Sequence, residues 1–131
     1  MPPTGRYLLD TNIVIALFAD EATVKARLAT AAEVFVPAVV LGELYVGARK
    51  SGQPAANLAK VEQFAAATAV LPSDAATARH YGEVKDGPRL KGRPIPENDV
   101  WIAAVVLQHG RTLVSCDAHF GDVDGLQVEV W

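Results

Sequence analysis

Short apolar runs alternate with longer amphipathic segments along most of this chain. The runs lie at residues 7–9, 34–36, 69–71 and 112–114, and each ends just before a polar residue or a proline. Short, largely apolar runs of this kind are typical of buried strands in parallel sheets. A last strand is expected at residues 127–130.

The segments between these runs carry apolar residues at helical spacing. In residues 38–50, for example, Val40, Leu44 and Ala48 share one helical face. Asp74 is expected to cap the helix that follows it, and Gly110 to end the helix at residues 97–108. The remaining helices are expected at residues 13–18, 21–31 and 55–68.

Two local features are predicted around the helix that follows Asp74. Gly87 and Pro88 should break or kink it, because proline lacks a backbone N–H and disfavours a helical residue before it. Residues 92–96, rich in glycine and proline, should form a loop, and Asn98 is a candidate cap for the next helix.

The alternation of strand and helix predicts an α/β fold. Successive parallel strands need right-handed crossovers, which place helices on both faces of the sheet. We therefore expect a three-layer α/β/α architecture with a central parallel sheet of four to five short strands. The length of 131 residues and a hydrophobic content of 50% fit a single domain over residues 1–131.

Composition excludes several classes of protein. Cys116 is the one cysteine, so neither an internal disulfide nor a thiolate zinc site is available. Its position beside Asp117 predicts a buried strand end, where cysteine behaves as a small apolar residue. The net charge of −3 is not that of a protein that binds nucleic acid through its overall charge, so any such affinity must come from a local patch or a metal.

The sequence also bears on location. Residues 1–6 lack the pattern of a signal peptide, and no apolar run approaches the roughly 20 residues that span a bilayer. The expectation is a cytoplasmic protein that does not enter a membrane.

Four acidic residues are candidates for chemistry. Asp10 and Asp117 each follow a predicted strand, Asp99 lies in the first turn of a helix, and Glu43 lies on another helix. Each acid alone is well explained as a turn residue, a helix-terminal charge or part of a solvated face. In a parallel sheet, however, ligands bind beyond the carboxyl ends of the strands, so the four carboxylates are expected in one crevice. Mutual repulsion would raise their pKa values or favour a bound cation, and oxygen ligands suit Mg²⁺ or Mn²⁺, so metal-assisted phosphodiester hydrolysis is predicted.

Four sequence blocks in order resemble the signature blocks of PIN-domain ribonucleases of the VapC toxin type. They are YLLDTNI, LGELYVGA, PENDVWIAA and SCDAHF, at residues 7–13, 41–48, 96–104 and 115–120. The resemblance implies an endoribonuclease that depends on Mg²⁺ or Mn²⁺. It also implies an RNA substrate, a VapB-type antitoxin, a homodimer and a toxin–antitoxin hetero-oligomer.

The resemblance assigns roles to the four acids and their neighbours. Asp10, Glu43, Asp99 and Asp117 correspond to the catalytic acids. Asp10 and Asp99 are expected as direct metal ligands, and Asp117 is expected to bind the metal directly or through water. Glu43 would position water or a second ion. Polar support is expected from Thr11, Asn12 and Ser115.

Other side chains near these acids keep two interpretations. His119 either contacts phosphate or orients its loop, or it is an ordinary loop histidine beside Phe120. Asp122 and Asp124 are interpreted as turn residues. A basic stretch leads into the helix of Asp99 and either guides RNA phosphates or forms a solvated surface; it contains Lys85, Arg89, Lys91 and Arg93.

Two other functions remain as alternatives. One is a catalytically silent PIN-fold module that binds RNA or a protein, which the presence of all four acids argues against. The other is a phosphatase with Asp10 as its nucleophile, which would need a second acid where Asn12 stands and a positioned lysine. Glycine-rich nucleotide loops and the serine-hydrolase elbow are absent from the sequence.

Overall fold

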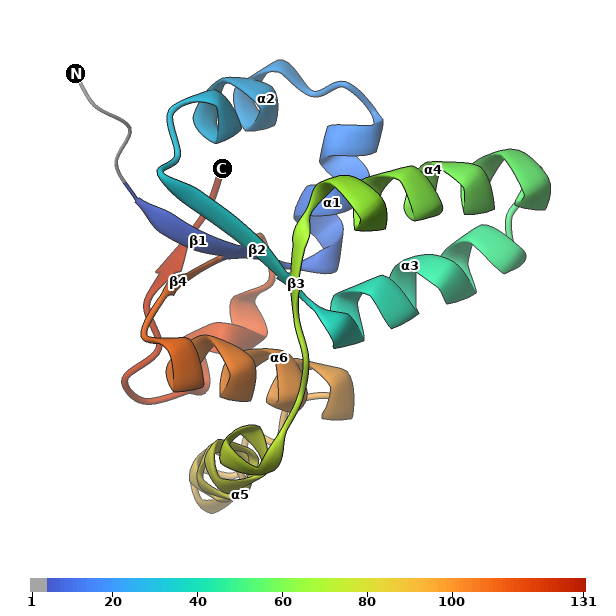
Figure 1. The fold of residues 1–131 in the computed structure, drawn as a ribbon. Coiled ribbons are helices and arrows are strands. Elements are labelled where there is room, and N and C mark those ends of the chain that lie inside the picture. The colour runs from blue at the N-terminus through green and yellow to red at the C-terminus, as the bar shows by residue number, and fades with distance from the viewer. Residues whose placement is uncertain (1–4) are drawn as a thin grey trace.

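A five-stranded, all-parallel sheet forms the centre of the computed structural model, which describes residues 5–131 (Figure 1). The strand order is β3-β2-β1-β4-β5. In this order Leu8 of β1 lies opposite Phe35 of β2 on one side and Leu113 of β4 on the other. The strands are β1 (Arg6–Leu9), β2 (Glu33–Pro37), β3 (Ala69–Leu71), β4 (Thr112–Val114) and β5 (Val128–Glu129).

Helices flank the sheet on both sides, as the three-layer prediction requires. Figure 1 shows α1 and α2 above the sheet and α5 and α6 below it, while α3 and α4 project together beyond one edge. The helices are α1 (Thr11–Phe18), α2 (Ala22–Ala29), α3 (Ala38–Arg49), α4 (Pro54–Ala67), α5 (Ala75–Leu90) and α6 (Glu97–His109), and a short 3-10 helix, η1, spans Ala118–Asp122.

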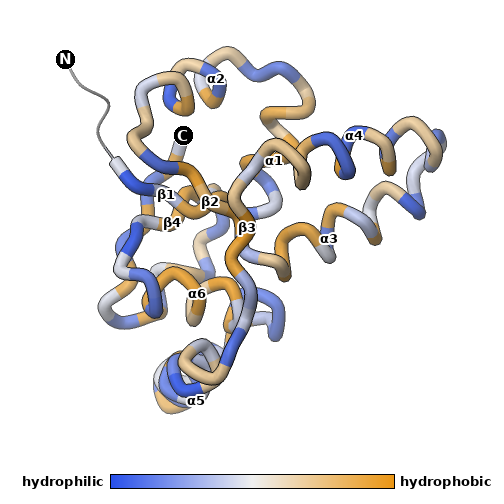
Figure 2. Tube along the Cα trace, viewed as in Figure 1, coloured by the Kyte–Doolittle hydropathy of each residue, from blue (hydrophilic) through white to orange (hydrophobic). Residues whose placement is uncertain are grey.

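Much of the core forms between the sheet and α6, and α1, α2, α3 and α4 also contribute buried residues. Leu8 and Leu113 from neighbouring central strands are fully buried, as are Ile102 and Val106 on α6. Helix α6 is among the most hydrophobic segments in Figure 2, whereas α5, which packs outside it, is more polar. Because α6 lies between the sheet and α5, it is buried on more faces than an amphipathic surface helix would be.

Several predicted helix ends are confirmed. The Asp74 side chain accepts a hydrogen bond from the Thr77 backbone N–H, and the Thr77 hydroxyl accepts one from the Asp74 N–H, which forms a capping box. Gly110 ends α6 with a left-handed φ of 62°, a conformation that glycine adopts without strain.

Of the break or kink predicted at Gly87 and Pro88, the break is wrong. Helix α5 continues through both residues and ends at Leu90. The clash that disfavours a helical residue before proline involves that residue's Cβ, which Gly87 lacks. Pro88 is buried near the helix end, so its missing N–H costs only one bond of the last turn.

The predicted cap at Asn98 is also wrong. Helix α6 begins at Glu97, so Asn98 is already inside the first turn, and Pro96 occupies the cap position without a side-chain hydrogen bond. The rigid, extended backbone of Pro96 precedes the first turn in place of a side-chain cap.

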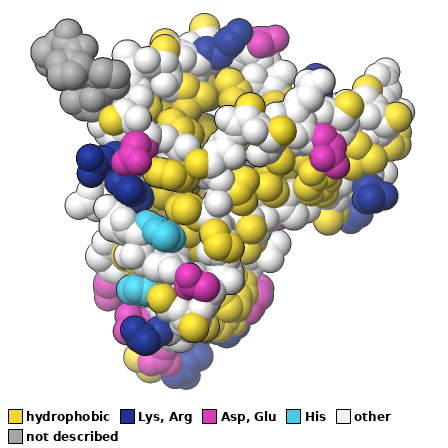
Figure 3. All heavy atoms as spheres, viewed as in Figure 1, with side chains coloured by type: hydrophobic (Ala, Val, Ile, Leu, Met, Phe, Trp, Pro, Cys, Tyr) yellow, Lys and Arg dark blue, Asp and Glu magenta, His cyan; other side chains and the backbone are white. Residues whose placement is uncertain are grey.

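The surface divides into apolar and charged regions. On the face in Figure 3, hydrophobic side chains form a band across the middle of the molecule, and charged side chains gather at the end that carries α5. Within residues 5–131 no helix combines the length and the hydrophobicity needed to cross a membrane. Residues 1–4, which belong to the stretch expected to lack a signal peptide, lie outside the described residues.

Candidate active site

The strand order brings the ends of β1 and β4 together. Asp10 directly follows β1 and caps α1, and its backbone N–H donates to the Val114 carbonyl at 3.0 Å. Ser115 directly follows β4 and is completely buried. Residues about a hundred positions apart in sequence therefore share one edge of the sheet.

Asp10 is held by three donors. Its Oδ1 accepts from the Thr11 backbone N–H at 2.8 Å, and its Oδ2 accepts from the Ser115 hydroxyl at 2.7 Å and the Asn12 amide at 3.2 Å. With only 4% of its surface exposed, the carboxylate has a fixed orientation. The structure thus brings together Asp10 and the three polar residues predicted to support it.

Ser115 also links Asp10 to Asp117. The Ser115 Oγ accepts a hydrogen bond from the Asp117 backbone N–H at 3.0 Å, and the Asn12 Oδ1 accepts one from the Cys116 N–H at 3.3 Å. The prediction that Cys116 is buried is wrong, since its side chain is exposed. The chain has left the strand at this point, and successive residues turn Ser115 inward and Cys116 outward.

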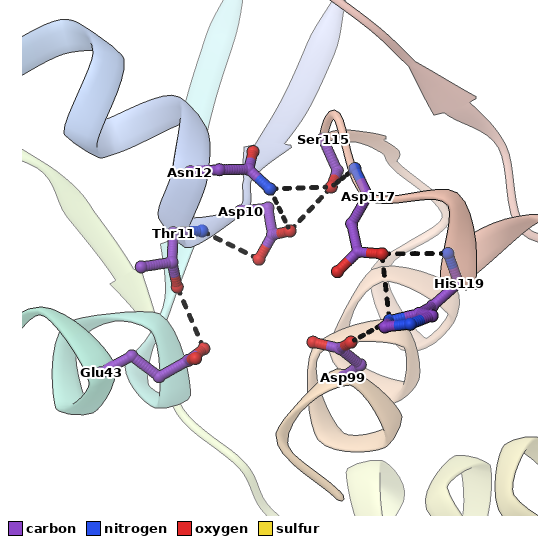
Figure 4. Close-up of polar contacts among 8 residues, drawn as sticks. All are labelled: Asp10, Thr11, Asn12, Glu43, Asp99, Ser115, Asp117 and His119. Atoms are coloured by element: carbon purple, nitrogen blue, oxygen red, sulfur yellow. Dashed lines mark hydrogen bonds and ion pairs between the residues drawn. The ribbon is translucent and has the colours of Figure 1, made fainter. Parts of the chain in front are cut away.

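Asp99 and Asp117 meet at the imidazole of His119. Its Nδ1 lies 3.0 Å from Oδ1 of Asp117 and 3.3 Å from Oδ2 of Asp99 (Figure 4). The three side chains come from α6, the loop after β4 and η1. Their possible ligand atoms all lie within 4.8 Å of one another. Within residues 5–131, these three side chains are the one group of three or more that could hold a metal ion.

Glu43 approaches from α3. Its Oε1 accepts a hydrogen bond from the Thr11 hydroxyl at 3.0 Å, so Thr11 contacts both Asp10 and Glu43. Asn98, whose predicted capping role failed, lies beside Glu43 instead. No local pattern in the sequence reveals this neighbour, because the contact joins α3 to α6.

Three of the four carboxylates have raised pKa values. Burial is the main cause at Asp10, Glu43 and Asp99. Neighbouring carboxylates add to the rise: Asp117 acts on Asp10, and Asp10 acts on both Glu43 and Asp99. Carboxylates that are costly to ionise alone favour a bound cation, because a cation offsets both the desolvation and the repulsion.

The predicted basic stretch lies in α5 and the loop after it. All four of its cations are paired with carboxylates of this chain: Lys85 with Glu97 at 2.6 Å, Lys91 with Asp124 at 2.7 Å, Arg93 with Asp122 at 3.4 Å, and Arg89 with Asp86. Asp122 and Asp124, interpreted as turn residues, therefore also tie η1 and the loop after it to this stretch.

Comparison with known proteins identifies the family. The profile of the PIN domain matches residues 7–126. The chain belongs to the PIN-domain family. All four signature blocks lie within the matched residues.

Within the PIN-domain family the relatives are VapC ribonucleases. The chain is 35% identical to Ribonuclease VapC2 of Haemophilus influenzae over 129 residues, which cover 96% of this chain and 98% of the relative. It is equally similar, with the same coverage, to the tRNA(fMet)-specific endonuclease VapC of Shigella flexneri.

Solved structures show the same fold. This PIN domain matches a chain in the crystal structure of VapBC2 from Rickettsia felis bound to a promoter DNA fragment, with a TM-score of 0.89, 28% identity and coverage of 95% and 98%. A chain of the DNA-bound VapBC from Salmonella typhimurium matches with the same score and identity, with coverage of 98% and 99%.

Proposed function

We propose that this PIN domain is an endoribonuclease that depends on a divalent metal ion and hydrolyses RNA phosphodiester bonds. The observation that carries the proposal is the convergence of four carboxylates from separate elements at the carboxyl edge of the sheet. Burial and mutual repulsion raise the pKa of three of them, which a surface cluster of acids would not show.

The donor set fits a hard divalent ion. The carboxylates of Asp10, Asp99 and Asp117 supply oxygen ligands of the kind that Mg²⁺ and Mn²⁺ prefer. These three residues would hold the ion. When bound, the ion would activate a water and offset the negative charge that develops on the scissile phosphate.

The chain's own residues would prepare the site for substrate. Thr11, Asn12 and Ser115 hold Asp10 in one orientation, so little reorganisation is needed when RNA binds. Glu43, which accepts a hydrogen bond from Thr11 and lies beside Asn98, would orient a water molecule toward the phosphate. The basic stretch would guide the RNA backbone toward these acids by exchanging its internal carboxylate partners for phosphates.

The relatives support a biological role as a toxin. Solved structures of similar proteins are VapBC complexes, and curated relatives are named as ribonucleases. We propose that this chain is the toxin of such a pair, that a VapB-type antitoxin neutralises it, that it forms a homodimer, and that it acts in the cytoplasm.

An apolar pocket is a suitable place for the antitoxin. It lies between α1, α3 and α4, has a volume of about 250 Å³, and reaches Glu43. Ile15, which lines the pocket, is 55% exposed and would be covered by a bound apolar segment. A segment bound there would also restrict access to the acids.

The test is cleavage of RNA by purified, antitoxin-free protein. Total bacterial RNA and initiator tRNA would each be incubated with Mg²⁺, with Mn²⁺ and with EDTA, alongside Asp99→Asn, and the cleavage ends mapped. Cuts that need metal and disappear in Asp99→Asn are expected. If folded, metal-bound protein cuts no RNA yet still binds it, the chain is a silent binding module instead.

A further inference from the structure

One nitrogen atom lies among the oxygen donors of the site. The His119 Nδ1 contacts Asp117 and Asp99, which belong to different elements. Figure 4 shows the imidazole between the carboxylates of Asp117 and Asp99, with Asp10 on the opposite side of these two carboxylates. The metal ligands expected from sequence were the carboxylates of Asp10, Asp99 and Asp117, with no nitrogen among them.

The spacing around Nδ1 matches the edges of a coordination octahedron. Two ligand atoms at about 2.1 Å from a six-coordinate ion, at right angles to each other, lie about 3.0 Å apart. The Nδ1 atom lies 3.0 Å from the Asp117 Oδ1 and 3.3 Å from the Asp99 Oδ2. With the ring proton on Nε2, the Nδ1 lone pair is available to an ion shared with these oxygens.

The loop does not need the imidazole to hold Asp117. The backbone N–H of His119 already donates to the Asp117 Oδ1 at 3.0 Å, and Asp117 caps η1 through this bond. The adjacent Phe120 is 1% exposed and anchors η1 in the core. The ring is therefore surplus to the structure of the loop, yet it lies where the carboxylates converge.

We propose that His119 is a nitrogen ligand of the divalent ion and makes the site prefer Mn²⁺ to Mg²⁺. The inference rests on the proposed function for the existence of the metal site and adds a ligand and a selectivity to it. Mg²⁺ binds through oxygen and gives up its waters reluctantly, whereas transition ions accept imidazole readily. An imidazole beside two carboxylates therefore gains more affinity for Mn²⁺ than for Mg²⁺.

Electron spin echo spectroscopy of bound Mn²⁺ tests the ligand directly. An untagged variant with His80→Gln and His109→Gln leaves His119 as the only histidine of the chain. We expect imidazole ¹⁴N coupling to Mn²⁺ in the native protein and in this double variant, and its loss in His119→Gln. Bound Mn²⁺ without imidazole coupling in the native protein, coupling that persists in His119→Gln, or failure to bind Mn²⁺ overturns the inference.

Titration calorimetry tests the selectivity. Glutamine has a similar reach and offers an amide oxygen, which Mg²⁺ accepts, in place of the ring nitrogen. His119→Gln should lower the Mn²⁺ affinity on the order of 10-fold or more and the Mg²⁺ affinity by a smaller factor. Equal losses for both ions would show that His119 only orients the carboxylates.

The two proposals fail separately. If the protein cuts RNA but its bound Mn²⁺ shows only oxygen ligands, the proposed nuclease activity is supported and His119 is not a metal ligand. If imidazole coupling is present but no RNA is cut, His119 is a metal ligand and the proposed nuclease activity is wrong.

Discussion

The Ser115 hydroxyl donates a 2.7 Å hydrogen bond to Oδ2 of Asp10 across 105 positions of sequence. Because the same oxygen of Ser115 accepts the Asp117 N–H, one buried side chain sets the positions of two acids. The bond joins the ends of β1 and β4 at the point where the proposed metal would bind.

Ser115→Ala should weaken both the fold and the site. Asp10 would lose its shortest hydrogen bond while staying buried, and a lost bond to a charged group costs about 1.5–3 kcal/mol. We expect a lower free energy of unfolding in urea and a lower kcat for RNA cleavage.

Ser51→Ala is the matched control for that change. The Ser51 hydroxyl donates to the Ala48 carbonyl at 2.6 Å, at the end of α3 and away from the acids. Ser51→Ala should lower the free energy of unfolding and leave kcat unchanged. Equal activity in Ser115→Ala and the native protein would show that the Ser115 bond does not serve catalysis.

Asp99→Asn should stabilise the metal-stripped protein at high pH. Burial raises the pKa of Asp99 in the folded state above its usual value of 3.8, so ionisation opposes folding. The loss of folding free energy that ionised Asp99 causes is fully present above the pKa of Asp99 in the folded state. It decreases as the pH drops through that pKa and vanishes below the pKa of the unfolded state.

Urea unfolding at pH 8, 6 and 4 would measure this difference. The advantage of Asp99→Asn should be largest at pH 8 and become small near pH 4. A saturating divalent ion at pH 8 should reverse the order, because the Asp99 carboxylate would bind the ion more tightly than a neutral asparagine amide. If Asp99→Asn is less stable than the native protein by the same amount at every pH, the pKa of Asp99 is not raised in the folded protein.

Lys91→Ala should weaken RNA binding. If Lys91 exchanges Asp124 for a phosphate, its loss raises KM and reduces the salt dependence of binding by about 0.7 in log–log slope. Asp124→Asn, which removes the competing carboxylate, should lower KM. Steady-state kinetics at several salt concentrations would measure both.

Lys25→Ala is the control for the charge itself. Lys25 pairs with Asp20 at 3.1 Å near the start of α2, remote in the chain from the basic stretch. Its KM should stay unchanged. If Lys91→Ala lowers kcat and leaves KM alone, the Lys91–Asp124 pair positions the loop after η1 and does not contact RNA.

Two glycines of α5 should respond differently to alanine. Gly82 and Gly87 both lie in the helix, and a Cβ at either position meets no atom within 4 Å outside its immediate neighbourhood. Gly82→Ala should raise the free energy of unfolding by about 0.5–1 kcal/mol. Gly87→Ala should not, because its Cβ would meet the ring of Pro88.

Thermal unfolding of both variants would test this, together with Gly87→Ala combined with Pro88→Ala. The combination should recover part of the helical gain that Gly87→Ala lacks, relative to Pro88→Ala alone. Equal stabilisation by both single changes would show that proline places no restriction on Gly87.

The sequence by itself predicted most of the elements and singled out the four acids. Strands at residues 7–9, 69–71 and 112–114 appear as expected, because strands of a parallel sheet covered by helices are apolar along most of their length. Asp10 and Asp117 follow two of these strands, so parallel topology was enough to direct both toward one edge. The fold class and the four signature blocks needed no coordinates.

Only the tertiary structure decided how those acids are held. The order β3-β2-β1-β4-β5 makes β1 and β4 neighbours, which allows Ser115 to reach Asp10. The same packing places Asn98 beside Glu43, contrary to its predicted capping role. These contacts join residues far apart in the chain, and local patterns report only on near neighbours. The His119 ring reaches Asp99 for the same reason: its position depends on how η1 packs against α6, which the core sets as a whole.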